Sequence, residues 1–353
     1  MTKIAATATG LPPHRYSQDE LIGAFRDLWS QRHYNLERLE QFHRNVLVGG
    51  RKLALPLEEY QTLQGFEDTN KAWTRVALDL AEQVTTDLLA KAGLSASDIH
   101  QIVFTTVTGL AVPSIEARLM NRMPFSTATK RMPLFGLGCL AGAAGAARLF
   151  DYLEGHPEEA GILLSVELCS LTLQREDMSV ANIISSGLFG DGAAAVLMVG
   201  DKHPLAETAG PSLLDSRSIF FPDSERVMGW DMVDTGFKVV LSQDVAPFAR
   251  DNLRPGVMEF LREHELTIED IGVWVAHPGG PKVIQAMTQS FGLPEDALQL
   301  SYDSLQRVGN LSSASVLFVL DETLRTKTPE PGTYGMLTAM GPAFAAEAVL
   351  MRW

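Results

Sequence analysis

The chain has 353 residues, 46% of them hydrophobic and 20% charged, which is typical of a water-soluble α/β protein with a sizeable core. The formal net charge of −14 argues against a nucleic-acid partner and against attraction to anionic lipid. Only two cysteines, no apolar signal-peptide core and no transmembrane segment of about 18 apolar residues together predict a cytoplasmic protein without structural disulfides.

The first predicted elements in chain order are helical. Residues 19–25 predict a helix outside the pattern of the remaining chain. A second helical stretch ends at Leu94 and leads through a polar turn and an Asp-Ile pair into a buried strand that ends near Thr106. The same succession recurs around Ile271, which lies 172 residues after Ile99 (271 − 99).

Two further segments repeat at this spacing. Cys139 corresponds to Leu311, because each lies at a glycine-led entry into an apolar helix. Residues 162–166 correspond to residues 334–338, and both segments are strand-like. Three matches at one spacing predict a duplicated α/β unit.

The repeat divides the chain into two pseudo-symmetric halves, residues 1–205 and residues 206–353. Near their junction, residues 200–230 are rich in Pro, Ser, Asp and Gly. We therefore expect a linker and surface loops over this stretch.

Cys139 is the candidate nucleophile of the first half. It follows two glycines, Gly136 and Gly138, and precedes small residues that predict a helix start. At a helix N-terminus, unpaired N–H groups and the helix dipole favour the thiolate, which is the nucleophile in acyl transfer. The alternative is a small buried side chain without chemistry, because free cysteine is commonly buried.

Two residues of the second half can reach the same cleft if the halves pack pseudo-symmetrically. His277 follows a buried strand, at the end where α/β sheets collect ligand sites. Asn310 stands at the helix start that matches that of Cys139, although Gly-Asn is equally a routine N-cap. A thiolate with two N–H donors can attack a thioester and stabilise an enolate, the charge that develops when a malonyl group loses CO₂.

Four segments carry a resemblance to a known family, namely Gly136–Cys139, Gly187–Ala195, His277–Pro281 and Gly309–Ala314. With these segments in this order, the chain from about residue 70 onward resembles the type III polyketide synthases, the chalcone synthase-like branch of the thiolase superfamily. The resemblance implies an α/β thiolase fold, a duplicated αβαβα layered sandwich.

The resemblance also implies roles for single residues. Cys139 would carry the acyl chain, while His277 and Asn310 would stabilise the enolate from malonyl-CoA. Phe189 matches the family's gatekeeper phenylalanine; without the family match it would be interpreted as a core aromatic residue. The other implied substrate-binding residues are Thr108, Cys169, Val239, Ser312, Gly279 and Gly280. No metal or cofactor is expected, because the substrates are CoA thioesters.

Basic residues near the N-terminus are the candidates for binding the CoA phosphates, because the family uses lysines and arginines there. Arg51 and Lys52 are the main candidates, together with Arg44. For each of them, the alternative is a solvated surface charge.

Two loops follow from the same resemblance. Residues 106–114 match the segment that crosses the family's dimer interface, which implies a homodimer, with Val112 reaching the partner's cavity and a cis bond before Pro113. The C-terminal loop, residues 339–344, departs from the family's Gly-Phe-Gly-Pro-Gly pattern. Ala343 replaces a glycine there and disfavours a positive φ, so we expect a differently shaped loop.

Residues 131–139 and 165–171 look closest to actinobacterial alkylpyrone synthases. The expected reaction condenses a medium- or long-chain fatty acyl-CoA with malonyl-CoA and releases an alkyl-α-pyrone. One alternative is an alkylresorcinol-forming type III polyketide synthase. Another is an initiating β-ketoacyl-[acyl carrier protein] synthase, whose usual sequence after the histidine differs from Pro-Gly-Gly-Pro. A third is a non-catalytic lipid-binding relative.

Overall fold

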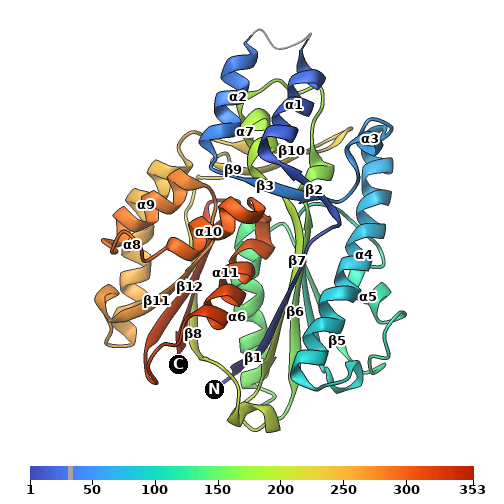
Figure 1. Ribbon diagram of the computed structural model, residues 1–353. Helices are drawn as coiled ribbons and strands as arrows, with labels where there is room; N and C mark the ends of the chain where they lie inside the picture. Colours follow the sequence, from blue (N-terminus) through green and yellow to red (C-terminus); the bar gives the residue numbers. More distant parts are fainter. Residues whose placement is uncertain (31–34) are drawn as a thin grey trace.

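One nine-stranded sheet dominates the structure, a computed structural model that describes residues 1–30 and 35–353. Two small two-stranded sheets, β2–β3 and β9–β10, lie near one end of it (Figure 1). In the large sheet the strand order is β11-β12-β13-β8-β1-β7-β6-β4-β5. The strands are β1 (Lys3–Gly10), β2 (His14–Ser17), β3 (Gly50–Leu53), β4 (Gln101–Thr106), β5 (Lys130–Phe135), β6 (Ala160–Leu168), β7 (Asp191–Val199), β8 (Ser212–Phe220), β9 (Met228–Val233), β10 (Gly236–Leu241), β11 (Ile271–Ala276), β12 (Tyr334–Gly341) and β13 (Ala345–Arg352).

The large sheet consists of two halves with the same local topology. In the first half β4 and β6 are parallel, β6 and β7 antiparallel, and β1 follows β7. In the second half β11 and β12 are parallel, β12 and β13 antiparallel, and β8 follows β13. The halves join through one pairing, between Lys3 and Ser212. This arrangement confirms the duplicated α/β unit.

The repeat is also present in the local hydrogen bonds. Before β4, the side chains of Ser95 and Asp98 each bond the other residue's backbone around a 3-10 turn. Before β11, Thr267 and Asp270 make the same capping box, again 172 residues later (267 − 95). The Asp-Ile pair of the sequence is therefore the end of a cap that starts each buried strand.

The spacing changes at the catalytic turns. The 3-10 turn that carries Cys139 begins at Gly138, whereas its counterpart begins at Ser312, so the spacing is 174 residues there (312 − 138). The structural counterpart of Cys139 is therefore Ser313. The predicted counterpart, Leu311, is two residues too early, because the chain between the strand and the helix is two residues longer in the second half.

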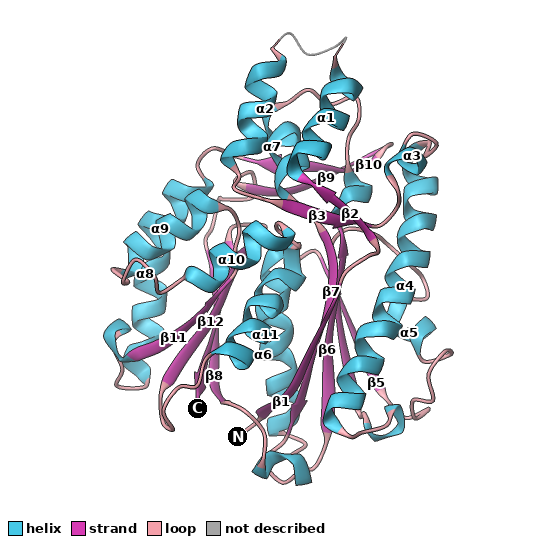
Figure 2. Cartoon of the chain, in the orientation of Figure 1, coloured by secondary structure: helices cyan, strands magenta, loops and turns pink. Residues whose placement is uncertain are grey.

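Helices form three layers around the two halves of the sheet (Figure 2). α6 and α11 lie between the halves and contact strands of both, α4 covers the outer face of the first half, and α8 and α9 pack together outside the second. No helix among the described residues has the length and apolar character needed to cross a bilayer. The helices are α1 (Gln18–Trp29), α2 (Leu36–Asn45), α3 (Leu57–Tyr60), α4 (Gly65–Ala92), α5 (Ile115–Leu119), α6 (Ala141–Glu154), α7 (Val180–Leu188), α8 (Val245–Glu263), α9 (Pro281–Phe291), α10 (Gln299–Val308) and α11 (Ser315–Thr326).

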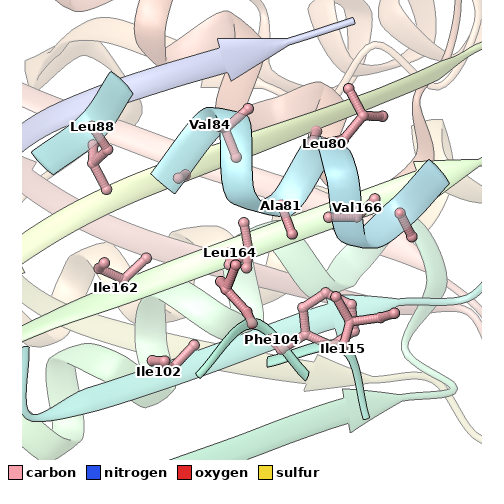
Figure 3. Close-up of a cluster of buried hydrophobic side chains, with 14 of the residues drawn as sticks. Leu80, Ala81, Val84, Leu88, Ile102, Phe104, Ile115, Ile162, Leu164 and Val166 are labelled. Atoms are coloured by element: carbon pink, nitrogen blue, oxygen red, sulfur yellow. The ribbon is translucent and has the colours of Figure 1, made fainter. Parts of the chain in front are cut away.

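The outer helix α4 packs on the sheet through one face (Figure 3). Its buried residues recur every three or four positions, as expected of an amphipathic helix, while those of the strands alternate. The side chains that meet there are Leu80, Ala81, Val84 and Leu88 of α4, Ile102 and Phe104 of β4, and Ile162, Leu164 and Val166 of β6.

The inner helix α6 consists of small residues for a steric reason. It lies so close to the turn before α11 that a Cβ on Gly142 would overlap the carbonyl oxygen of Ser313 and crowd Val316. The small residues that follow Cys139 in the sequence therefore let the two central helices approach each other.

The expectation of loops over residues 200–230 is wrong for the segment 212–220. That segment is β8, which pairs with β13 along its whole length. Its polar side chains have partners on neighbouring elements: Asp215 bonds His264, Arg217 bonds Glu263 and Ser218 bonds Glu347. The polar composition therefore reflects a half-buried strand with paired side chains.

The predicted N-terminal helix is present as α1, which starts at a capping box between Ser17 and Glu20. α1, α2, α7 and the two small sheets form a cap over one end of the large sheet (Figure 1). Apolar residues of α1 and α2 pack with α7 around Trp29 and Leu39. The cap is not part of the repeat.

Candidate active site

Cys139 lies where the sequence predicts it, between a strand and a helix. β5 ends just before Gly136, and a 3-10 turn from Gly138 to Leu140 leads directly into α6. Gly136 and Gly138 have φ values of 92° and 52°, in the left-handed region that favours glycine. The thiol is buried, and its Sγ lies 3.6 Å from the Oγ of Ser312 in the second half.

His277 and Asn310 reach this centre from the second half. His277 directly follows β11, and Asn310 follows α10. The Asn310 side chain donates from Nδ2 to the carbonyl of Gly279 (3.3 Å) and accepts at Oδ1 from the N–H of Ser312 (2.8 Å). Contacts therefore run from Cys139 through Ser312, Asn310 and Gly279 to His277. The three candidate catalytic residues lie around one buried centre.

Burial determines the charge states of the pair. It raises the pKa of the Cys139 thiol to about 12, against hydrogen bonding with Ser312, and lowers the pKa of His277 to about 3. The expected thiolate at a helix N-terminus is therefore not favoured while both groups stand alone. A thiolate becomes accessible when its proton moves to the imidazole, because the pair then stays neutral overall. Both ring nitrogens of His277 are buried without a hydrogen-bond partner in the described chain, so they can take part in this transfer.

Glu167 is a buried residue of this centre that the sequence reasoning missed. Its carboxylate accepts hydrogen bonds from Thr106, Thr108, the N–H of Val107 and Ser313, the last at 2.5 Å. Burial raises its pKa despite these bonds. A single carboxylate in the otherwise apolar strand β6 was the available signal, because a buried charge requires partners.

A cavity of about 370 Å³ lies beside the catalytic centre. Three of the expected substrate-binding residues line it: Phe189, Cys169 and Val239. Phe189 connects the cavity to the centre, because it forms a β-bridge with Asn310, whose carbonyl accepts the N–H of Gly190 at 2.9 Å.

The other four expected substrate-binding residues lie around the catalytic residues instead of in the cavity wall. Thr108 donates to Glu167 at 2.8 Å, and Ser312 contacts Cys139. Gly279 accepts a bond from Asn310, and Gly280, with φ 147°, begins α9.

Arg51 does not occupy the position expected of a CoA-phosphate ligand. It is buried in β3, and its Nη1 donates to two backbone carbonyls, those of Ser186 (2.7 Å) and Phe189 (2.6 Å). Because these bonds face the protein interior, we withdraw the phosphate assignment for Arg51. Lys52, next on the strand, is partly exposed, and Arg44 is exposed and pairs with Asp19.

The C-terminal loop corrects a second expectation. Ala343 adopts a positive φ of 59° despite its Cβ. Its carbonyl accepts a bond from Ser224 (2.9 Å), and the adjacent Phe344 is fully buried, with its ring 4.5 Å from that of Phe248. These contacts hold the loop in a left-handed conformation that costs about 1–2 kcal/mol for a residue with a side chain.

The loop of residues 106–114 carries an exposed apolar residue. The Val112–Pro113 peptide bond is cis, as the resemblance implies, and Val112 is 96% exposed. Leu110 in the same loop and Phe135 at the end of β5 are also exposed.

Fold and centre together define a class of protein. Two αβαβα halves place a cysteine at a helix start and a histidine and an asparagine of the other half around one buried point. This arrangement is that of a condensing enzyme with the thiolase fold, in which a thiol carries an acyl group and N–H donors stabilise an enolate.

Comparisons with known proteins identify the family within this class. Residues 4–202 match the N-terminal domain of chalcone and stilbene synthases, and residues 212–353 match their C-terminal domain. The chain therefore belongs to the chalcone and stilbene synthase family, the type III polyketide synthases, which are acyltransferases that perform decarboxylative condensation of CoA thioesters with malonyl-CoA.

Individual relatives cover the whole chain. It is 47% identical over 352 residues to a 1,3,6,8-tetrahydroxynaphthalene synthase from Streptomyces peucetius subsp. caesius, covering 100% of this chain and 93% of the relative. It is 27% identical to an alpha-pyrone synthesis polyketide synthase-like protein from Mycobacterium tuberculosis, covering 98% and 90%. The crystal structure of 1,3,6,8-tetrahydroxynaphthalene synthase from Streptomyces coelicolor A3(2) matches with a TM-score of 0.94 at 30% identity, covering 99% of each chain.

Proposed function

We propose that this polyketide synthase extends a medium- or long-chain fatty acyl-CoA with malonyl-CoA and releases an alkyl-α-pyrone. The observation that carries the proposal is the cavity next to Phe189. Its 370 Å³ correspond to roughly a dozen water volumes at about 30 Å³ each, which is room for a chain of similar length.

The wall of this cavity is apolar where it meets the N-terminal cap. α1 contributes Leu21, Phe25 and Leu28, and the segment after β6 contributes Leu171 and Leu173. These side chains are continuous with the apolar cluster around Trp29. An alkyl chain that enters here loses its contact with water, which is worth about 0.8 kcal/mol for each buried methylene.

The catalytic residues would act in a fixed order. The Cys139 proton passes to His277, and the sulfur attacks the acyl-CoA carbonyl, releasing the CoA thiol. Malonyl-CoA then loses CO₂, and the remaining electron pair forms an enolate whose oxygen is stabilised by N–H groups of Asn310 and His277. The enolate carbon attacks the Cys139 thioester, so a C–C bond forms as the C–S bond breaks. After further extension, an enol oxygen attacks the thioester carbonyl and closes the lactone.

Purified protein incubated with lauroyl-CoA and malonyl-CoA tests this proposal, with products identified by mass spectrometry. We expect a dodecanoyl-primed pyrone. An alkylresorcinol would keep the starter but change the ring closure, which would refute the pyrone part of the proposal. Absence of any acyl-primed product would refute the fatty acyl starter.

A cavity variant makes the test sharper. Ala24 of α1 lines the cavity, whereas Asp27 of the same helix is exposed. We expect Ala24→Trp to shift the preferred starter to shorter chains, and the matched control Asp27→Trp to leave the preference unchanged. Equal chain-length profiles for both variants would contradict binding of the acyl chain in this cavity.

A second candidate starter is malonyl-CoA itself. It is favoured by the relative named 1,3,6,8-tetrahydroxynaphthalene synthase, which is 47% identical over the full chain. The same assay with malonyl-CoA alone distinguishes the two candidates. A tetrahydroxynaphthalene formed faster than any acyl-primed product would favour this second function.

We further propose a cytoplasmic homodimer in which Val112 contacts the partner subunit. Exposure of Val112, Leu110 and Phe135 supports this proposal, because exposed apolar side chains near one another are typical of an interface. The initiating β-ketoacyl synthase and the non-catalytic lipid-binding relative are not proposed, because the chain matches the chalcone and stilbene synthase family over both domains.

A further inference from the structure

Arg51 binds the end of the helix that carries the gatekeeper residue. α7 ends at Leu188, and Phe189 is its C-cap. The carbonyls of a last helical turn have no partner within the helix and attract a cation. Arg51 Nη1 donates to two of them, those of Ser186 (2.7 Å) and Phe189 (2.6 Å), from a strand 135 residues earlier in the chain.

The other carbonyls of this helix end also have partners outside the helix. Gln18 donates to the carbonyl of Gly187 (3.0 Å), and His43 bonds that of Ile183 (2.8 Å). The N–H of Asn310 donates to the carbonyl of Leu188 at 2.9 Å. The cap and the catalytic asparagine therefore bind the same helix end, and Arg51 is its only described side-chain partner with a permanent charge.

The alkyl part of Arg51 lies between the gatekeeper and the catalytic asparagine. A Cβ on Gly309 would lie 3.1 Å from its Cδ, and a Cβ on Gly190 would lie 3.5 Å from its Cγ. Gly190 follows Phe189, and Gly309 precedes Asn310. Each of the two reaction-site residues thus has a neighbour that packs against the same buried arginine.

The surroundings of Arg51 keep it charged and in place. Asp191, at the start of β7, is the nearby carboxylate, and it accepts bonds from the backbone N–H groups of Ala54 (2.6 Å) and Ser170 (2.8 Å). Burial lowers the pKa of His43 to about 4, so this neighbour stays neutral and does not repel the guanidinium at neutral pH. A buried cation in this position is costly unless its bonds are made, which favours one fixed geometry.

We propose that Arg51 is a positioning residue of the condensation reaction: by holding the carbonyl of Phe189 and packing beside Gly309, it fixes the gatekeeper ring relative to the Asn310 amide. Arg51 itself touches no reacting atom. Its removal would displace Asn310 from the position that stabilises the enolate, and a misplacement of about 1 Å costs on the order of 100-fold in rate.

The test separates two half-reactions of the same protein. Loading of Cys139 by an acyl-CoA, followed by intact-protein mass spectrometry, needs the thiol but no enolate. Malonyl-CoA decarboxylation, followed by CO₂ release, needs Asn310. We expect Arg51→Met to lower kcat of decarboxylation about 100-fold with KM and the loading rate nearly unchanged. Arg51→Lys keeps the charge but not the planar fork, so it should recover part of the loss.

The control is Arg26→Met, which removes an exposed arginine of the cap that pairs with Glu40. It should leave both half-reactions unchanged. Wild-type kcat in Arg51→Lys and Arg51→Met would overturn the proposal, as would an equal loss of loading and decarboxylation in a folded variant. If Arg51→Met does not fold, the ratio of the two rates in Arg51→Lys decides by the same criterion.

Discussion

His277 is predicted to control the reactivity of Cys139, and replacing it by glutamine tests this directly. Burial raises the pKa of the thiol to about 12 and lowers that of the imidazole to about 3. Neither charged form is therefore stable alone. If the imidazole accepts the thiol proton, the thiolate has a counter-charge; glutamine can donate a hydrogen bond but cannot accept a proton there.

The magnitude follows from the thiol. Its pKa of about 12 lies three units above the ordinary value of 9.0. Three units correspond to about 4 kcal/mol, or roughly a 1,000-fold smaller thiolate fraction at pH 7. In His277→Gln we expect alkylation of Cys139 about 1,000-fold slower than that of an ordinary cysteine at pH 7, and rising tenfold for each pH unit. The wild type should react faster and with a flatter pH profile.

The assay is alkylation by iodoacetamide between pH 6 and pH 10, followed by intact-protein mass spectrometry in a Cys169→Ala background. Cys169 is removed because it is the second free thiol, although burial also raises its pKa. Circular dichroism of the variant checks that it is folded. The reasoning is refuted if His277→Gln and the wild type are alkylated at the same rate across this range.

Three further predictions follow from single contacts. Gly142→Ala should lower the free energy of unfolding by about 1–3 kcal/mol in chemical denaturation, because its Cβ meets the Ser313 carbonyl; unchanged stability would contradict the packing of α6 against the turn before α11. Ala343→Gly should keep or raise the melting temperature in calorimetry, because the φ of 59° favours glycine, whereas a clear loss of stability would contradict the left-handed loop. Val112→Asp should produce monomers in sedimentation velocity, and an unchanged sedimentation coefficient would contradict its place in a dimer interface.

The catalytic centre was largely predictable from the sequence because it is built from local signals. Glycines before Cys139 and Asn310 and the strand end before His277 are features of neighbouring residues, and the repeat relates them across 172 to 174 residues. The fold class followed from the same repeat. Each of these inferences required only backbone preferences that short segments express.

The parts that were not predictable depend on contacts between distant segments. β8 has the composition of a loop, and only its partners on β13 and α8 make it a strand. Ala343 has a residue type that disfavours its conformation, and the burial of Phe344 imposes it. Arg51 has the residue type of a phosphate ligand, but its acceptors lie 135 and 138 residues later in the chain.

The division between repeated and unrepeated elements explains how the family can vary its products. Cys139, His277 and Asn310 belong to the repeated halves, where the backbone of one half supports that of the other. The cavity wall comes mainly from elements outside the repeat, including α1, α3 and the β9–β10 sheet, and the cap binds the helix end that carries Phe189. Substitutions in the cap can therefore change the cavity without moving the thiol or the imidazole. For this reason a close relative with the same catalytic residues need not make the same product, and the starter must be determined from the cavity itself.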